Sequence, residues 1–176
     1  MKSTGIIQKY TIDNIPDTEI KPFWKPYGEM KYCCQWYKSN FNSPKTGRTF
    51  ICMEQYMMYQ KAILFGDKES ADKIMKETDP AKIQKLGRGV KNFDAKMWDE
   101  YKYSIVCYGN YLKFSQNETL KKWLKSTGDS ILVEASPYDG VWGVKMSESD
   151  SNIECPDMWR GQNLLGFALM QVRDEL

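Results

Sequence analysis

The sequence predicts an α+β fold, a single mostly helical domain with a few short strands. Its 176 residues are 41% apolar, which suits one domain with a core large enough to fold alone. The clearest apolar periodicity repeats at steps of three and four residues, as in helices, whereas only short runs fit strands. Prolines and glycines are spread along the chain and mark no linker. We therefore expect residues 1–176 to form one domain.

The first fifty residues mix aromatic side chains with turn residues. Residues 31–36 and 49–52 are the runs in this region that fit short strands. The first helix is expected over 53–64, because this stretch contains neither proline nor glycine and Gly66 follows as a stop signal.

Two shorter helices follow in the sequence. Asp67 can cap a helix that runs to about residue 75. Asp79 and Pro80 place a capping carboxylate before a proline at the first helical position, which opens a helix expected to end before Gly87.

The strongest helix prediction covers 95–114. One apolar stripe runs along it at helical spacing and predicts that this helix crosses the core; its members are Trp98, Tyr101, Ile105, Tyr108 and Leu112. Asn117 can cap a further helix carrying Leu120 and Leu124, which Thr127 and Gly128 end.

The last quarter of the chain begins with a strand and ends with a helix. Residues 131–133 are expected to form a buried strand, with 142–144 pairing nearby. A final helix is expected over about 163–173, and its inward side chains are Leu164, Phe167, Ala168 and Val172.

Composition excludes several classes of function. The formal net charge of +2 is too small to hold long nucleic acid through phosphate neutralisation alone, so any such contact is local. Histidine is absent, which removes Ser/His and Cys/His nucleophile pairs and histidine metal sites, and we expect no metal and no cofactor. The five cysteines are odd in number and form no C-x-x-C pair, which favours reduced thiols.

No window is apolar over the roughly 18 residues that a membrane span requires, and the N-terminus does not resemble a signal peptide. We therefore expect a cytoplasmic protein without membrane contact.

Glu54 and Lys61 are seven residues apart on the expected first helix, two turns apart on nearly the same face. For an arbitrary pair of this kind, a solvated surface stripe is the commoner interpretation. Arg88 lies between two glycines after a helix, where it can bind a phosphate or simply mark a helix stop. Arg160 is a second arginine beside a glycine, directly before the final helix, whose N-terminus could bind an anion.

The segment 134–143 is a polar, turn-rich loop after the expected buried strand, with two carboxylates and an indole. Such loops commonly carry function. The alternative makes Asp139 a turn residue and Trp142 a core anchor. Trp98 is likewise either a core side chain or part of a pocket mouth.

Taken in order, a series of short segments between Phe50 and Gly166 resembles the NADAR family, which includes the YbiA-like proteins. The resemblance covers about 36–173 and leaves 1–35 uncovered. The residues that carry it are Phe50, Glu54-Gln55-Tyr56, Lys61-Ala62, Leu86-Gly87-Arg88, Trp98, Lys113-Phe114 with Gln116, Thr127-Gly128-Asp129, Leu132 to Ser136, Asp139 with Trp142-Gly143, and Trp159-Arg160-Gly161 with Asn163 and Leu165-Gly166. Val144 follows Gly143 where some members of the family have a glycine or an isoleucine, and we expect this difference to change only the shape of the pocket.

The resemblance implies the mostly helical α+β domain of YbiA-like proteins and N-glycosidase activity, which cleaves the bond between ribose C1 and an exocyclic base nitrogen. The first substrate class known in the family is ADP-ribose on the guanine amino group of DNA, RNA or a nucleotide, and this is the substrate we expect here. The alternatives are ribosylamino-pyrimidine phosphates of riboflavin biosynthesis, or an ADP-ribose-binding module without catalysis. We expect the protein to act as a monomer.

Matching the family's motifs assigns catalytic roles to Glu54, Lys61 and Asp139. It assigns substrate binding to two indoles and three polar residues, Trp98, Trp142, Arg88, Arg160 and Asn163. In one mechanism Lys61 attacks the opened ribose as a Schiff-base nucleophile while Glu54 relays protons. In the rival mechanism Glu54 or Asp139 activates water and Lys61 only holds the substrate.

Overall fold

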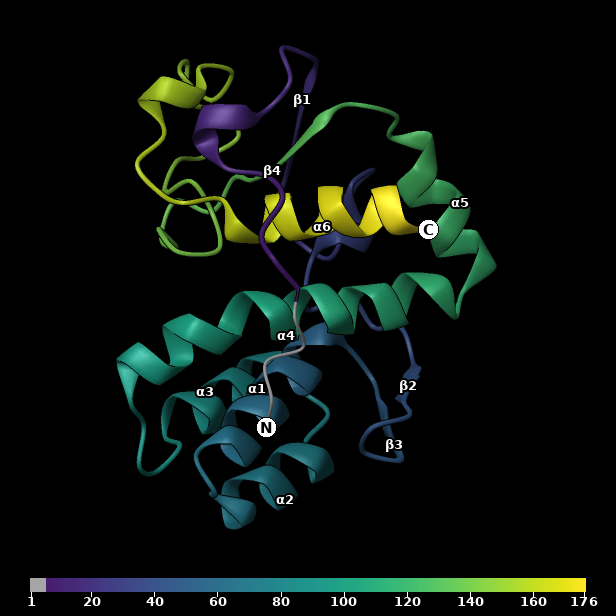
Figure 1. Cartoon of the computed structure of the whole chain (residues 1–176), viewed down its shortest axis with the longest axis vertical. Coiled ribbons are helices and arrows are strands. Elements are labelled where there is room, and N and C mark those ends of the chain that lie inside the picture. Colours follow the sequence, from purple (N-terminus) through teal and green to yellow (C-terminus); the bar gives the residue numbers. More distant parts are fainter. Residues whose placement is uncertain (1–5) are drawn as a thin grey trace.

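Helices make up most of the fold in the computed structural model, which describes residues 6–176 (Figure 1). The helices are α1 (Met53–Leu64), α2 (Lys68–Lys76), α3 (Pro80–Arg88), α4 (Ala95–Ser115), α5 (Glu118–Ser126) and α6 (Leu164–Glu175). The strands are β1 (Ile20–Phe23), β2 (Phe41–Ser43), β3 (Arg48–Phe50) and β4 (Ile131–Glu134). Short 3-10 helices span Ile12–Asn14, Lys31–Cys33 and Pro156–Met158. Within the described part of the chain, no helix is both long enough and apolar enough to span a bilayer.

Helix α4 lies between two groups of elements (Figure 1). On one side it contacts α1, which also packs against α2 and α3, and on the other it contacts α6, which packs against β4. Ile105 and Leu112 of the predicted stripe are buried, and the three aromatic members pack against the core. The prediction of a core-crossing helix is confirmed.

The strands form two small sheets. β1 and β4 are parallel, with Ile20 opposite Ile131 and Phe23 opposite Glu134, and β2 and β3 form an antiparallel hairpin. Because β1 and β4 run in the same direction, the residues that follow them emerge at the same edge. This edge brings Trp24 close to Glu134 and the loop after it.

The predicted caps of the helices are confirmed. The side chain of Asp67 accepts a hydrogen bond from the Ser70 backbone (3.0 Å), and Asn117 accepts one from the Leu120 backbone (3.1 Å). Asp79 likewise caps α3. The four inward side chains predicted for the last helix are all buried, and the helix itself continues to Glu175.

Helix α3 does not end before Gly87, as the sequence suggested, but continues through Arg88. Gly87 faces α1, and a Cβ atom built on it would lie 1.9 Å from the Met58 sulfur. The glycine therefore permits close packing of two helices and is no stop signal here.

Residues 31–36 do not form the expected strand. A 3-10 helix occupies Lys31–Cys33 instead. The Nζ atom of Lys113 donates hydrogen bonds to the carbonyls of Tyr32 (2.6 Å) and Cys34 (3.4 Å), which in a strand would accept from a neighbouring strand. Residues 142–144 form no strand either, and their backbone contact with β4 is the hydrogen bond from the Val144 N–H to the Glu134 carbonyl (3.0 Å). The hairpin strand expected over 49–52 lies at Arg48–Phe50, and β1 and β2 were not predicted.

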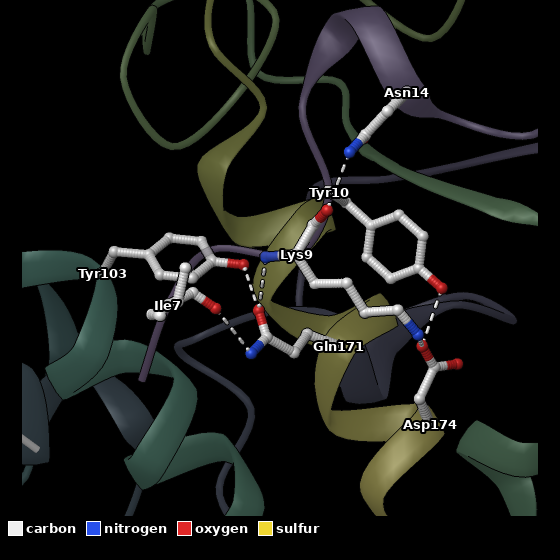
Figure 2. Close-up of polar contacts among 7 residues, drawn as sticks. All are labelled: Ile7, Lys9, Tyr10, Asn14, Tyr103, Gln171 and Asp174. Atoms are coloured by element: carbon white, nitrogen blue, oxygen red, sulfur yellow. Dashed lines mark hydrogen bonds and ion pairs between the residues drawn. The ribbon is translucent and has the colours of Figure 1, made fainter. Parts of the chain in front are cut away.

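The segment before β1 packs on α4 and α6, and Gln171 is central to this contact (Figure 2). Its side-chain oxygen accepts hydrogen bonds from the Tyr103 hydroxyl (3.0 Å) and the Lys9 backbone (3.1 Å), and its nitrogen donates to the Ile7 carbonyl (3.0 Å). Asp174, one turn later, accepts from the Tyr10 hydroxyl (2.7 Å) and pairs with Lys9. This part of the chain, outside the predicted motifs, is thus joined to the core.

Candidate active site

A cavity of about 500 Å³ opens at the edge where β1 and β4 end, and α1, the end of α3 and the start of α4 close its other sides. Its volume is in the range of small-molecule sites. Four of the chain's six tryptophans line it, namely Trp24, Trp36, Trp98 and Trp142. The cavity therefore offers aromatic faces for a planar or sugar-like ligand.

Glu54 is in the cavity wall and almost fully buried, which overturns the interpretation of a solvated stripe. Its Oε1 atom is enclosed and has no hydrogen-bond partner within residues 6–176. Burial raises the pKa of Glu54 to about 7, although a hydrogen bond from the Trp36 side chain and the charge of Arg88 oppose the shift. Near neutral pH this carboxyl group is thus able both to give and to take a proton.

Lys61 lies at the same cavity, two turns after Glu54. Its Nζ atom donates to the Gly87 carbonyl (2.9 Å) and lies 4.4 Å from the ring centre of Phe93 and 5.7 Å from that of Trp98. Burial and the nearby charge of Arg88 lower the pKa of Lys61, while Glu54 opposes this. The shift favours the neutral amine, which is the nucleophilic form.

Glu134, which the sequence analysis did not select, ends β4 in the cavity wall. Its Oε2 atom is enclosed and lacks a partner in the described structure. Burial raises the pKa of Glu134 to about 8, and the negative charges of Asp139 and Glu54 add to the effect. The signal that could have found it is its place at the end of a buried strand.

Asp139 serves as a turn residue and also lines the cavity, so both interpretations of it apply. Its Oδ1 atom accepts hydrogen bonds from the backbones of Val141 and Trp142, each at 2.8 Å. These bonds fix the loop that carries the Trp142 indole into the cavity wall. Gly143, directly after it, lies too close to the Glu134 carbonyl for a side chain, since a Cβ there would be 2.5 Å from that oxygen.

Gln35 is a second residue that the sequence analysis missed. It follows the 3-10 helix at Lys31–Cys33, lines the cavity and is 7% exposed. Both polar atoms of its side chain are enclosed and have no partner within residues 6–176. No sequence signal identified it, because a single glutamine between Cys34 and Trp36 belongs to no motif.

Of the remaining predicted site residues, two line the cavity and two do not. Arg88 and Trp98 line the cavity, whereas Arg160 does not: its side chain is 62% exposed and 3.7 Å from Asp150. Asn163 is fully buried outside the cavity lining, where its amide binds the Glu134 backbone N–H (3.0 Å) and the Leu132 carbonyl (2.9 Å). Asn163 therefore fixes the end of β4, and we assign it no contact with a ligand.

The described residues contain no group of three or more His, Cys, Asp or Glu side chains arranged to hold a metal ion. The cavity instead places the carboxyl groups of Glu54, Glu134 and Asp139 opposite two cations, Lys61 and Arg88. This set can transfer protons, provide a nucleophilic amine and neutralise an anion.

Comparison with known proteins identifies relatives of the chain. The sequence pattern of the NADAR domain matches residues 22–176. N-glycosidase R617 of Acanthamoeba polyphaga mimivirus is 44% identical over 144 residues, covering 80% of this chain and 85% of that protein. Protein irg-1 of Caenorhabditis elegans is 43% identical over 129 residues, which cover 72% of this chain and 61% of that protein.

A structural relative is the Escherichia coli protein YbiA, whose NMR structure superimposes with a TM-score of 0.73 at 22% identity. The superposition covers 96% of this chain and 89% of that one. In sequence, N-glycosidase YbiA of Escherichia coli is 28% identical over 130 residues, covering 74% of this chain and 72% of that protein. The expected mostly helical fold with few short strands is confirmed.

Proposed function

Because the chain belongs to the NADAR family of YbiA-like N-glycosidases, we propose that it is a hydrolase that removes ADP-ribose from the guanine amino group. The observation that carries the proposal is the pairing, in one aromatic cavity, of Lys61 with Glu54. The lysine has a lowered pKa and the carboxyl group has a pKa of about 7. The name of the mimiviral relative supports cleavage of an N-glycosidic bond.

The mechanism we propose begins with opening of the ribose ring. The exocyclic nitrogen forms a double bond to C1 as the ring oxygen leaves and takes a proton. The neutral amine of Lys61 adds to C1, and Glu54 protonates the base nitrogen, which departs as the free amine of guanine. Water then hydrolyses the imine between Lys61 and C1, so the products are ADP-ribose, unmodified guanine and the regenerated lysine.

The other cavity residues bind and orient the substrate in this proposal. Trp98 and Trp142 stack on the base or the ribose, and Arg88 pairs with a phosphate of ADP-ribose. Asp139 fixes the loop of Trp142, and its charge raises the pKa of Glu54. Recognition of one modified base in a pocket needs few backbone contacts, which suits a net charge of +2.

The test is mass spectrometry of an oligonucleotide that carries ADP-ribose on a guanine amino group. The wild type is expected to release ADP-ribose and leave guanine unmodified, and Glu54→Gln to lower kcat/KM about 10²–10⁴-fold because it removes the proton donor. Gln162→Met, at an exposed glutamine outside the cavity, is the matched control and should keep full activity.

Two further arms separate the alternatives. Borohydride should trap ADP-ribose covalently on Lys61, and Lys61→Arg should abolish both adduct and turnover; turnover by Lys61→Arg would instead favour direct attack by water. An intact oligonucleotide contradicts the proposal. Cleavage of a ribosylamino-pyrimidine phosphate would then assign the riboflavin-type substrate, and tight binding of ADP-ribose without cleavage would assign a binding module.

A further inference from the structure

The side-chain amide of Gln35 is buried, and neither of its polar atoms has a hydrogen-bond partner in the described part of the chain. Unpaired enclosed polar atoms are rare in folded proteins because each loses its hydrogen bonds to water. Among the described residues that line the cavity, side-chain atoms in this state belong to Gln35, Glu54 and Glu134. Glu54 already has a chemical role in the proposed reaction, and Glu134 is a carboxyl group beside it. Gln35 cannot exchange protons, so its unpaired donor and acceptor are explained best by a ligand.

The backbone around Gln35 is firmly held. Its carbonyl accepts a hydrogen bond from the Glu54 backbone (3.0 Å), which joins it directly to the first turn of α1. On the N-terminal side of Gln35, the fully buried Lys113 donates hydrogen bonds to the carbonyls of Tyr32 and Cys34. The amide is thus presented from a fixed backbone directly beside the proposed proton donor.

A carboxamide presents a donor and an acceptor side by side, and its natural complement is a lactam, in which N–H adjoins C=O. Guanine substituted on its 2-amino nitrogen has such an edge, formed by N1–H and O6. The carbon that bears the scissile nitrogen is bonded directly to N1. A base held by this edge therefore keeps the scissile nitrogen close to the point of contact, in the cavity that Glu54 also lines.

We propose that Gln35 determines base specificity by reading the lactam edge of guanine, with its oxygen accepting from N1–H and its nitrogen donating to O6. This inference rests on the proposed function and deepens it. Gln35 selects bases that carry a lactam next to the scissile amine, and rejects bases that present a lone pair at N1 and nothing at C6.

The experiment crosses a protein variant with a substrate variant. One oligonucleotide carries ADP-ribose on the amino group of guanine, and the other carries it on the amino group of 2-aminopurine, which lacks both N1–H and O6. The protein variants are Gln35→Met, which keeps the side-chain length without polar atoms, and the control Gln162→Met.

On the guanine substrate, Gln35→Met should lower kcat/KM about 100-fold; on 2-aminopurine the loss should be under about tenfold. The wild type should strongly prefer guanine, and the variant should largely lose that preference. Gln162→Met should match the wild type on both substrates. Since the Gln35 side chain makes no hydrogen bond to residues 6–176, Gln35→Met should also melt no lower than the wild type.

If Gln35→Met lowers kcat/KM equally on the two substrates, the assignment of Gln35 is overturned. If the melting temperature of the variant also falls, the Gln35 amide has a structural role instead. A wild type that cleaves the guanine substrate without preferring it over 2-aminopurine overturns the lactam contact but leaves the proposed function standing. A wild type that cleaves neither substrate refutes the proposed function, and the inference with it.

Discussion

At the scale of single residues, the cavity brings together acids that a stable fold would otherwise avoid. Glu54 and Glu134 each have an enclosed oxygen without a partner among residues 6–176, and burial raises the pKa of both, with the charge of Asp139 adding to the effect. An ionised carboxylate in such surroundings is unfavourable because burial removes its water and its enclosed oxygen gains no compensating donor from the described residues. The same cost keeps protons on these groups near neutral pH, which an acid catalyst needs.

The substitution Glu134→Gln should stabilise the protein at alkaline pH. The folded pKa of about 8 lies above the ordinary value of 4.5, so the folded state binds the extra proton in the interval between them. The contribution of Glu134 to the free energy of unfolding is fully present below about pH 4.5 and is lost as the pH rises to about 8. Denaturant unfolding should give the variant about 2–4 kcal/mol more stability than the wild type at pH 8.5, and little gain at pH 5. An equal gain at both pH values would contradict the raised pKa.

At the scale of elements, helices were predictable because their signals are local. The caps Asp67, Asp79 and Asn117 and the stripe of α4 lie within the segments they define, and all were confirmed. Strands β1 and β2 depend on partners far away in the sequence, so a short run of residues does not reveal them.

The residues of the candidate site also divide into those that the sequence predicted and those that only the structure reveals. The spacing of Glu54 and Lys61 placed them on nearly the same face of one helix, and the resemblance to the NADAR family assigned both of them, and Trp98, to the site. Gln35 becomes conspicuous only through burial without a partner among the described residues, which is a property of the folded molecule. Glu134 shares this property, although its place at the end of a buried strand was already visible in the sequence. Arg88 and Arg160 looked alike in sequence, each beside a glycine, yet of the two only Arg88 lines the cavity. Arg88 ends α3 at the cavity wall, whereas Arg160 follows the 3-10 helix at Pro156–Met158 and its side chain lies 3.7 Å from Asp150.

The packing of α3 on α1 predicts the effect of Gly87→Ala. Alanine is the better helix former, but its Cβ would lie 1.9 Å from the Met58 sulfur and 2.9 Å from the Met58 Cβ, so the helices must separate. We expect a loss of about 1–3 kcal/mol in stability. We also expect lower activity, because the Gly87 carbonyl holds Lys61.

Gly89→Ala is the matched control for this pair of helices. A Cβ at Gly89 would meet its closest neighbour, the Leu86 carbonyl oxygen, at an ordinary 3.5 Å. Chemical denaturation and kcat/KM of the two variants should therefore differ clearly. If Gly89→Ala is as harmful as Gly87→Ala, the contact with Met58 is not the cause.

At the scale of the whole molecule, two surfaces of the fold have separate tasks. The cavity opens where β1 and β4 end, while the segment before β1 is fixed to α4 and α6 through Gln171 (Figure 2). None of the residues shown in that contact lines the cavity. The segment also precedes residue 22, where the match to the family begins. It should therefore support stability without taking part in chemistry.

The substitution Gln171→Leu tests this separation. It leaves the Tyr103 hydroxyl, the Lys9 backbone N–H and the Ile7 carbonyl without their partner. The expected cost is about 1–3 kcal/mol, or a melting temperature lower by about 3–10 °C, with kcat/KM at 25 °C within about twofold of the wild type. Asp174→Asn, which weakens the solvent-exposed pair with Lys9, should lower the melting temperature less than Gln171→Leu does. A fall in kcat/KM well beyond twofold in the still-folded Gln171→Leu protein would show that the N-terminal segment also shapes the cavity.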